Sequence, residues 1–380
     1  MADDLPRGLS RPANVCLVGL IAGGHSGVPR YAAKLAQALD RVAEEEPRLS
    51  LSVLTNRAGA EAIQARSIDV RVVGGQHRAV NSGPGRLFLE HTSLVRVKAD
   101  LLHFFDVSGP ILAPRRRFVA TAHDATLVHY GFGILRTWYK RRLYPWALRR
   151  ASAVVAVSQF AKDETVQYFG VDPAKIAVVH SGPGLGSAYP GSPTPERERT
   201  GPYLLYVGNL GTNKNLSFLV RSFHRADPRA RLVLASPNRR GSAEVTAAIS
   251  GGPAQDRIEI VEGVTDQELD RLYRSALALV LPSTYEGFGF TALEAMGRGC
   301  PVLASDIPAL REVSGSGAML LPVSDESAWA AAILRVVEDE ELRSDLRKRG
   351  AAAVSRYSWE RTARGVLDVF STLLLPLAPD

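Results

Sequence analysis

Two glutamates and two glycines stand close together in residues 286–294. Glu286 and Glu294 are eight positions apart, and Gly287 and Gly289 lie just after the first of them. Glycines let the backbone approach a ligand closely, and the N–H groups of a helix that begins after them would form an anion site, usually for phosphate. Two carboxylates beside such a site suit a ligand that combines a diphosphate with several hydroxyl groups. Nucleotide-sugars meet that description.

A second loop offers a positive charge. Residues 206–215 contain Gly208 and Gly211 and place Lys214 just before the next predicted helix. A lysine ammonium neutralises a diphosphate without imposing a planar geometry. In the first half of the chain, His123 follows an apolar run and so lies at the carboxyl end of a predicted strand. Ligands of open α/β sheets bind at that end of the strands.

Short apolar runs alternate with helical patterns, and these predict the elements that would position the polar residues. In the first half, strands are predicted at residues 15–20, 49–54, 69–73, 101–105, 118–121, 153–157 and 176–179. Helical spacing is present between them, for example in residues 28–39 and 159–169, and Ser158 is a suitable N-cap for the second of these helices. This alternation predicts a parallel sheet with helices on both faces.

The alternation stops at residues 187–202, which contain four prolines and the run Glu-Arg-Glu-Arg, and we interpret them as an exposed linker. A second alternation follows, with strands predicted at residues 203–207, 231–235, 258–261, 276–281, 302–304 and 318–321. Helices are predicted at residues 290–296 and 358–374. Two similar α/β halves joined by a linker predict a cleft between them.

The composition is that of an ordinary soluble protein. A chain of 380 residues is too long for one typical core, so two domains are expected. The net charge of +7 does not by itself indicate nucleic-acid binding, although it allows attraction to anionic lipids or substrates. Cys16 and Cys300 form neither a disulfide framework nor a metal-ligand cluster, and we expect buried thiols in a reducing cytoplasm.

No apolar run reaches the roughly eighteen residues needed to cross a bilayer. Residues 15–22 have the length of a signal-peptide core. Two acidic residues near the start, Asp3 and Asp4, and the glycine-rich loop after this run favour a buried first strand instead.

The run Glu-Gly-Phe-Gly-x3-Leu-Glu-Ala-Met from Glu286, followed by Gly-Cys-Pro-Val-Leu-Ala-Ser, resembles the Glu-x7-Glu signature of the retaining GT-B glycosyltransferases of family 4. The resemblance covers most of the chain and is strongest over residues 203–370. It implies the GT-B fold, an α/β architecture of two Rossmann-like domains whose parallel sheets face a central cleft. The domains implied are an acceptor-side domain at residues 1–186, a linker at 187–202, a donor-binding domain at 203–357, and a C-terminal helix at 358–380 that crosses back to the N-terminal domain.

The resemblance also implies roles for individual residues. Glu294 would accept hydrogen bonds from the ribose hydroxyls, Glu286 would lie beside the transferred sugar, and Lys214 would bind the diphosphate. His123 resembles the histidine that contacts the transferred sugar near the reacting carbon, so His123, Glu286 and Lys214 form the predicted catalytic group. Residues 23–28 resemble a Gly-Gly-x-Gly-Val element of the family, in which His25 would approach the donor phosphate or the acceptor. Donor contacts are further implied at Gly27, Gly208, Val264, Gly287, Phe288, Gly289 and Phe290.

These features imply a metal-independent retaining transferase that moves a hexose-type sugar from a nucleotide diphosphate-sugar to a hydroxyl of a polysaccharide, glycolipid or natural product. No cofactor and no metal are expected, because Lys214 and helix-terminal amides could neutralise the diphosphate. Asn209 departs from the family pattern, since many members have an arginine at that position. A catalytically decayed binding protein and a GT-B nucleotide-sugar epimerase are the alternatives. Mannosyl, glucosyl, rhamnosyl and N-acetylhexosaminyl transfer all stay open.

Residues 134–150 combine basic and aromatic side chains. Such a segment suits peripheral contact with an anionic membrane, and it equally suits a surface helix that lines an acceptor cleft. The expected partners are the nucleotide-sugar donor and the hydroxyl acceptor, with no nucleic acid. The expected location is cytoplasmic, either free or peripheral at the inner face of the membrane.

Overall fold

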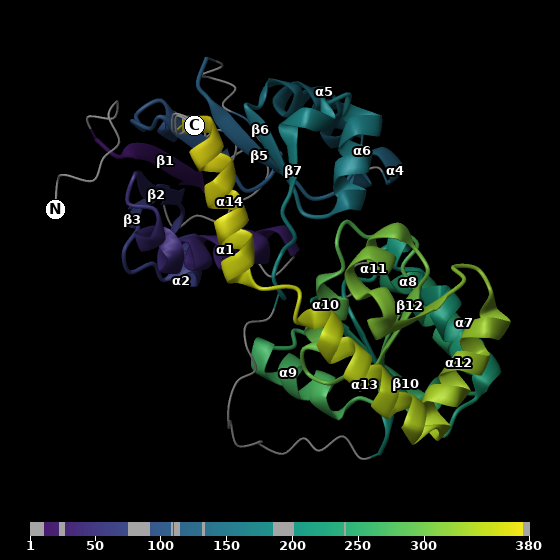
Figure 1. The fold of residues 1–380 in the computed structure, drawn as a ribbon. Helices are drawn as coiled ribbons and strands as arrows, with labels where there is room; N and C mark the ends of the chain where they lie inside the picture. The colour runs from purple at the N-terminus through teal and green to yellow at the C-terminus, as the bar shows by residue number, and fades with distance from the viewer. Residues whose placement is uncertain are drawn as a thin grey trace. The chain divides into compact units, whose positions relative to one another are not determined.

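The computed structural model describes residues 11–22, 27–74, 92–107, 109, 115–130, 134–184, 201–238 and 241–374 (Figure 1). The chain divides into two compact units. Unit 1 combines Met1–Gly182 with Ser358–Asp380, and unit 2 is Pro183–Tyr357. Residues 187–200 of the predicted linker lie outside the described residues, as does His25.

Unit 1 contains, among its described residues, a seven-stranded parallel sheet in the order β3-β2-β1-β4-β5-β6-β7. Its strands lie within two residues of the predicted positions: β1 (Ala13–Val18), β2 (Leu49–Thr55), β3 (Asp69–Val72), β4 (Leu101–Phe104), β5 (Phe118–Ala122), β6 (Ala153–Ala156) and β7 (Ile176–Val178). The predicted first strand is displaced because its pairing with β2 already begins at Ala13 and Leu49. β1 ends at Val18, two residues earlier than predicted.

The helices of unit 1 include one from the far end of the chain. Among the described residues they are α1 (Gly27–Val42), η1 (Ala43–Glu45), α2 (Arg57–Ile63), α4 (Thr126–His129), α5 (Ile134–Arg150), α6 (Gln159–Phe169), η3 (Pro173–Lys175) and α14 (Trp359–Leu374). α14 packs against α1 (Figure 1). The predicted N-cap of α6 is confirmed, since Ser158 Oγ accepts from the Ala161 N–H at 2.9 Å.

Unit 2 contains, among its described residues, a six-stranded parallel sheet in the order β10-β9-β8-β11-β12-β13. The strands are β8 (Tyr203–Val207), β9 (Arg231–Ser236), β10 (Ile258–Glu262), β11 (Ala278–Leu281), β12 (Val302–Ser305) and β13 (Ala318–Leu321). The chain runs outward from β8 to β10 and then returns to β11, which pairs with β8. Strand order reverses between β8 and β11, and such a switch point is where open α/β sheets bind ligands.

One predicted strand of unit 2 is shorter than expected. Residues 276–281 were predicted to be extended, but β11 begins at Ala278. Ala276 instead caps the preceding helix, because its N–H donates to Leu272 O at 3.1 Å.

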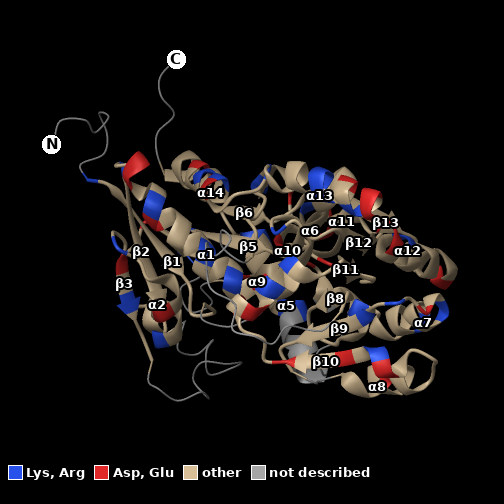
Figure 2. Ribbon diagram, turned by 90° about the horizontal axis from the view of Figure 1, so that it is seen from below, with Lys and Arg blue, Asp and Glu red and all other residues tan. Residues whose placement is uncertain are grey.

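The helices of unit 2 form two groups. α7 packs against α8 and α12, whereas α10 contacts α9, α11 and α13. Right-handed crossovers in opposite directions from the switch point put the two groups on opposite faces of the sheet. Figure 2 shows charged residues along the helices and mostly uncharged strands in the sheets. The bounds are η4 (Thr212–Lys214), α7 (Leu216–Ala226), α8 (Ser242–Ser250), η5 (Gln255–Arg257), α9 (Asp266–Ser275), α10 (Phe290–Met296), α11 (Pro308–Ser314), η6 (Gly315–Gly317), α12 (Glu326–Glu338) and α13 (Glu340–Val354).

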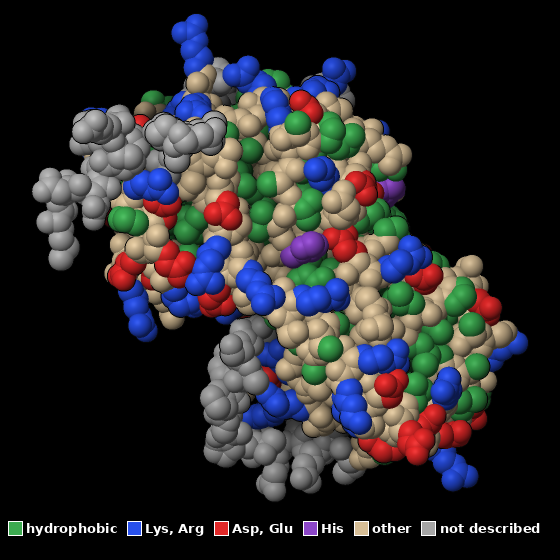
Figure 3. Space-filling view, in the orientation of Figure 1, with side chains coloured by type: hydrophobic (Ala, Val, Ile, Leu, Met, Phe, Trp, Pro, Cys, Tyr) green, Lys and Arg blue, Asp and Glu red, His purple; other side chains and the backbone are tan. Residues whose placement is uncertain are grey.

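Cys16 and Cys300 are buried free thiols, and burial raises the pKa of Cys300 to about 12. Figure 3 shows acidic and basic side chains interspersed over the face in view. No helix in the described part of the chain is both long and apolar enough to cross a membrane.

Candidate functional site

Two loops of unit 2 meet at the switch point between β8 and β11. The Thr284 N–H donates to Asn213 O at 2.9 Å, and Asn213 Nδ2 donates to Tyr285 O at 3.3 Å. These bonds hold the lysine-bearing loop against the glutamate-bearing loop. Lys214 Nζ consequently donates to Glu286 Oε1 at 2.6 Å. Two of the three predicted catalytic residues are thus in direct contact.

Glu286 is held through one of its two carboxylate oxygens. Oε1 accepts from Lys214 and also from the hydroxyl of Ser283, at 2.7 Å. The Lys214 and Glu286 side chains are only 16% and 18% exposed, so the pair is shielded from water. Within the described part of the chain, nothing is seen to donate to Oε2. That oxygen is available to a ligand hydroxyl.

Gly208 is required by the turn that leads from β8 towards Lys214. Its φ of +154° is rare for residues with a side chain, and a Cβ there would lie 2.5 Å from Tyr206 Oη. The Tyr206 hydroxyl donates to Asn209 O at 2.6 Å and so closes the turn. Burial, with the nearby charge of Glu286, raises the pKa of Tyr206 well above its usual value. The phenol therefore stays protonated and remains a donor.

The side chain of Asn209 stabilises the loop in which it lies. Its side-chain Oδ1 accepts from the Gly211 N–H at 3.1 Å. The position that is an arginine in many family members thus contributes no cation here.

The residues after Glu286 lead directly into α10, which begins at Phe290 as predicted. Gly289 has a φ of +114°, and a Cβ on it would come 3.0 Å from Leu310 Cδ2. The buried ring of Phe288 packs on Phe290, with ring centroids 5.1 Å apart. The side chain of Phe288 therefore stabilises the loop, and the backbone of Gly287 to Phe290 is the part that could contact a ligand.

Glu294 lies in the second turn of α10 and is only 3% exposed. Its Oε2 accepts from the hydroxyl of Tyr273 at 2.8 Å. Glu294 is therefore hydrogen-bonded to Tyr273, which was not among the site residues predicted from the sequence. Tyr273 was missed because it continues the apolar face of α9 with Leu269 and Leu272, where a tyrosine resembles any core residue.

Val264 lies between the end of β10 and α9. It is half-buried and packs against the core of unit 2. Gly263 before it has a φ of +65°, and Thr265 after it begins a capping box with Glu268. These two neighbours fix the chain path at Val264.

Unit 1 carries the remaining predicted residues. His123 follows β5, and its Nε2 donates to Phe105 O at 2.8 Å. Burial lowers the pKa of His123, so the ring is neutral and its Nδ1 is an acceptor. Tyr31 packs edge-on against the His123 ring, with centroids 4.7 Å apart. Gly27 is the exposed first residue of α1.

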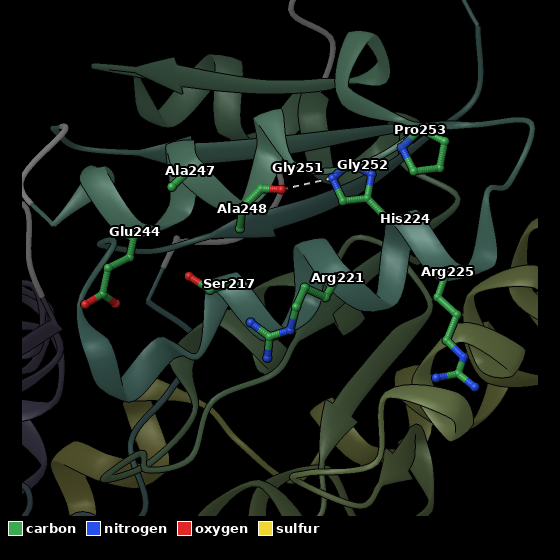
Figure 4. A pocket seen from close by; sticks show the side chains of 10 residues that line it. All are labelled: Ser217, Arg221, His224, Arg225, Glu244, Ala247, Ala248, Gly251, Gly252 and Pro253. Carbon is green, nitrogen blue, oxygen red and sulfur yellow. Dashed lines mark hydrogen bonds between the residues drawn. The ribbon is translucent and has the colours of Figure 1, made fainter.

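A hollow of about 690 Å³ lies between α7 and α8 (Figure 4). None of the predicted site residues lines it. His224 faces this hollow, but its Nε2 donates to Ala248 O and Ile249 O, both at 3.1 Å, and its Nδ1 accepts from the Ala254 N–H. The ring is therefore used to close the C-terminal end of α8.

The described residues contain no cluster of three or more His, Cys, Asp or Glu side chains able to hold a metal ion. Lys214 is the cation that the structure places beside Glu286.

Comparisons with known proteins match both halves of the chain. The family model for group 1 glycosyl transferases matches residues 193–353, and the model for glycosyltransferase family 4 matches residues 25–183.

Two curated relatives are similar over part of the sequence. The O-antigen chain mannosyltransferase RfbU of Salmonella typhimurium is 27% identical over 245 residues, which are 64% of this chain and 67% of that protein. The D-inositol 3-phosphate glycosyltransferase of Frankia alni is 29% identical over 254 residues, which are 60% of each chain. The similarity therefore spans about two thirds or less of the length of these relatives.

A solved structure shares the fold over nearly the whole chain. Anabaena Alr3699/HepE, determined in complex with UDP and glucose, has a TM-score of 0.73 and 18% identity and covers 95% of this chain and 100% of its own. Both units therefore have the Rossmann-like α/β architecture of GT-B proteins, as predicted.

Proposed function

Because this chain belongs to the group 1 glycosyltransferases of the family 4 type, we propose that it transfers a hexose-type sugar from a nucleotide diphosphate-sugar to an acceptor hydroxyl. The contact between Lys214 and Glu286 at the switch point carries this proposal. A cation suited to a diphosphate and a carboxylate suited to sugar hydroxyls thus lie side by side. Relatives named as sugar transferases and a structural neighbour in complex with UDP and glucose support it.

Lys214 is suited to holding the donor diphosphate. An ammonium group has three N–H donors, and only one of them is directed at Glu286. The other two can reach phosphate oxygens, joined by backbone N–H groups of residues 287–290. As the bond to the sugar breaks, negative charge builds up on the diphosphate, and a fixed cation stabilises that charge. This makes a metal ion unnecessary in the proposed mechanism.

The proposed reaction retains the configuration of the anomeric carbon. The bond between that carbon and the diphosphate oxygen breaks, and the acceptor oxygen bonds to the same face of the sugar. The acceptor proton passes to the departing phosphate oxygen. Glu286 does not act as a nucleophile in this scheme, and its Oε1 stays engaged by Lys214 and Ser283. Its Oε2 instead accepts a hydrogen bond from the transferred sugar.

Three other predicted residues bind the donor in this proposal. Glu294 accepts hydrogen bonds from the ribose hydroxyls, and Val264 contacts the base. The neutral Nδ1 of His123 accepts a hydrogen bond from a hydroxyl of the transferred sugar.

The described part of α5 supports a peripheral membrane role. Arg141, Arg142, Arg149 and Arg150 are exposed, and the Arg150 guanidinium lies over the Trp146 ring at 6.0 Å. Basic and aromatic side chains together favour an anionic lipid surface. We therefore propose a cytoplasmic enzyme whose acceptor is either lipid-linked at the inner face of the membrane or a free carbohydrate.

The first test needs no acceptor. The melting temperature of the protein is measured with GDP-, UDP-, dTDP- and ADP-sugars, because a bound ligand raises it by mass action. The best donor is then incubated with the protein, and released nucleoside diphosphate is measured for the wild type, Lys214→Met and the exposed control Lys348→Met. We expect slow donor hydrolysis by the wild type and the control and its loss in Lys214→Met. The anomer first released, read by proton NMR, should match the donor.

A binding protein without activity is the second candidate, because Asn209 supplies no cation at its position. It predicts a melting shift with one donor and no hydrolysis, with or without candidate acceptors. A covalent sugar adduct on Glu286 would contradict the proposed mechanism.

A further inference from the structure

Tyr273 is fully buried in α9, and its hydroxyl donates a hydrogen bond to Glu294 Oε2 at 2.8 Å. A buried carboxylate is costly unless donors are aimed at it. Other buried phenols need no such partner. Tyr203, in the same unit, donates instead to the backbone carbonyl of Leu272 at 2.8 Å. The contact between Tyr273 and Glu294 thus joins a core residue to a residue of the proposed donor site.

A buried ion pair holds the ring of Tyr273 in place. The Arg298 guanidinium lies over this ring at 6.0 Å, and its Nε donates to Asp270 Oδ1 at 2.7 Å. Arg274 donates to the other oxygen of Asp270, also at 2.7 Å. Asp270 stands three residues before Tyr273 in α9, and Arg298 Nη1 reaches Glu294 O at 3.2 Å. The pair therefore fixes α9 against the end of α10, and the phenol cannot swing away.

The other oxygen of Glu294 faces Gly184. A Cβ at residue 184 would lie 2.3 Å from Glu294 Oε1, so only a glycine leaves room for the carboxylate in this orientation. Tyr273 on one side and Gly184 on the other together define a single orientation of Glu294.

We propose that Tyr273 is a positioning residue, whose hydroxyl holds Glu294 in the orientation that accepts hydrogen bonds from ribose and thereby makes the site prefer ribonucleotides over 2′-deoxyribonucleotides. This rests on the proposed function, because only there does Glu294 bind ribose. A carboxylate oxygen has two lone pairs, so a hydrogen bond from Tyr273 and one from a ligand hydroxyl can be accepted by the same atom. Burial, followed by the charge of Glu294, raises the pKa of Tyr273 well above its usual value, so the phenol remains a donor at any working pH.

The test compares the dissociation constants of UDP, GDP and ADP with those of their 2′-deoxy forms, measured by calorimetry. Tyr273→Phe keeps the ring and removes the hydroxyl. Tyr203→Phe is the matched control, because it also removes one buried hydrogen bond but none to Glu294. We expect Tyr273→Phe to weaken the preferred ribonucleotide by about tenfold or more and to leave the 2′-deoxy form nearly unchanged. The control should keep the wild-type ratio.

Each other outcome has a separate meaning. If no nucleoside diphosphate binds the wild type, the proposed function fails and this inference fails with it. If the wild type binds but does not prefer the ribo form, or if Tyr273→Phe keeps the wild-type ratio, the inference alone fails. Glu294→Asp serves if Tyr273→Phe does not fold, because it withdraws the carboxylate from Tyr273 by one methylene. An unchanged ratio in that variant would also overturn the role of Tyr273.

Discussion

Glu286 shows how a single side chain is prepared for a ligand. Lys214 and Ser283 both donate to its Oε1, so the carboxylate has one fixed oxygen and one oxygen directed elsewhere. Ser283 was not selected from the sequence, although it stands three residues before Glu286 at the end of a predicted strand. A small hydroxyl at that place was a usable signal.

Ser283→Ala should therefore weaken donor binding. A hydrogen bond to a charged group contributes about 1.5–3 kcal/mol, so we expect the dissociation constant of the donor to rise about tenfold or more. Ser222→Ala is the matched control, because Ser222 is also fully buried but its Oγ has no hydrogen-bond partner among the described residues. Calorimetry on both variants would reveal the difference, and equal affinities would show that Ser283 does not orient Glu286.

His103 predicts a pH dependence of stability. It is fully buried, its Nε2 lies 3.0 Å from Thr121 Oγ1, and burial lowers its pKa to about 3. The folded protein keeps this ring neutral, whereas the unfolded chain protonates it below its usual pKa of about 6.5. The stability that it contributes is therefore complete above that pH and is lost as the pH falls towards 3.

We expect His103 to account for a loss of about 2 kcal/mol in the free energy of unfolding between pH 7.5 and pH 5. Urea unfolding of the wild type and His103→Gln at both pH values would measure this share as a smaller pH dependence in the variant. His180→Gln, at an exposed histidine, should keep the wild-type pH dependence. Identical pH dependence in all three proteins would mean that the unfolded and folded chains protonate His103 alike.

At the scale of elements, the turn after β8 depends on Gly208. An alanine there must adopt a φ of +154° and would push against Tyr206 Oη, which lies 2.5 Å from the Cβ position. We expect Gly208→Ala to cost about 1–3 kcal/mol of stability and to abolish donor binding, since Lys214 follows this turn. Gly299→Ala is the control, because its φ is +69° but no atom lies within 4 Å of its Cβ position. Retained donor binding in Gly208→Ala would show that the turn tolerates the displacement.

The sequence predicted most strands and the helix α10, because each apolar run is short and bounded by turn residues. It did not predict where β11 begins, since Ala276 is as apolar as the strand that follows, and only its bond to Leu272 O assigns it to α9. Lys214 and Glu286 were recognisable from their glycine-rich surroundings. Tyr273 was not, because its contact with Glu294 joins residues 21 positions apart through a fold that spacing alone does not reveal.

At the scale of the whole molecule, unit 1 is completed by the last residues of the chain. Ser358–Asp380 belong to it, and Phe370 of α14 is fully buried there, 5.3 Å from the ring of His103. Unit 2 has a core of its own, in which Phe223 of α7 is also fully buried. Truncating the buried phenylalanine of one unit should therefore destabilise that unit and leave the other unit unchanged.

Phe370→Ala and Phe223→Ala test this independence as a matched pair. Each should destabilise its own unit by about 3–5 kcal/mol, because truncating a buried phenylalanine removes apolar contacts and leaves a cavity. Amide hydrogen exchange should rise in β1, β4 and α1 for Phe370→Ala and in β8, β9 and α7 for Phe223→Ala, with the other unit unchanged. If either variant raised exchange equally in both units, the chain would unfold as one cooperative body. With independent units, Phe370→Ala should also retain binding of the nucleoside diphosphate part of the donor, because Lys214, Glu286 and Glu294 all belong to unit 2.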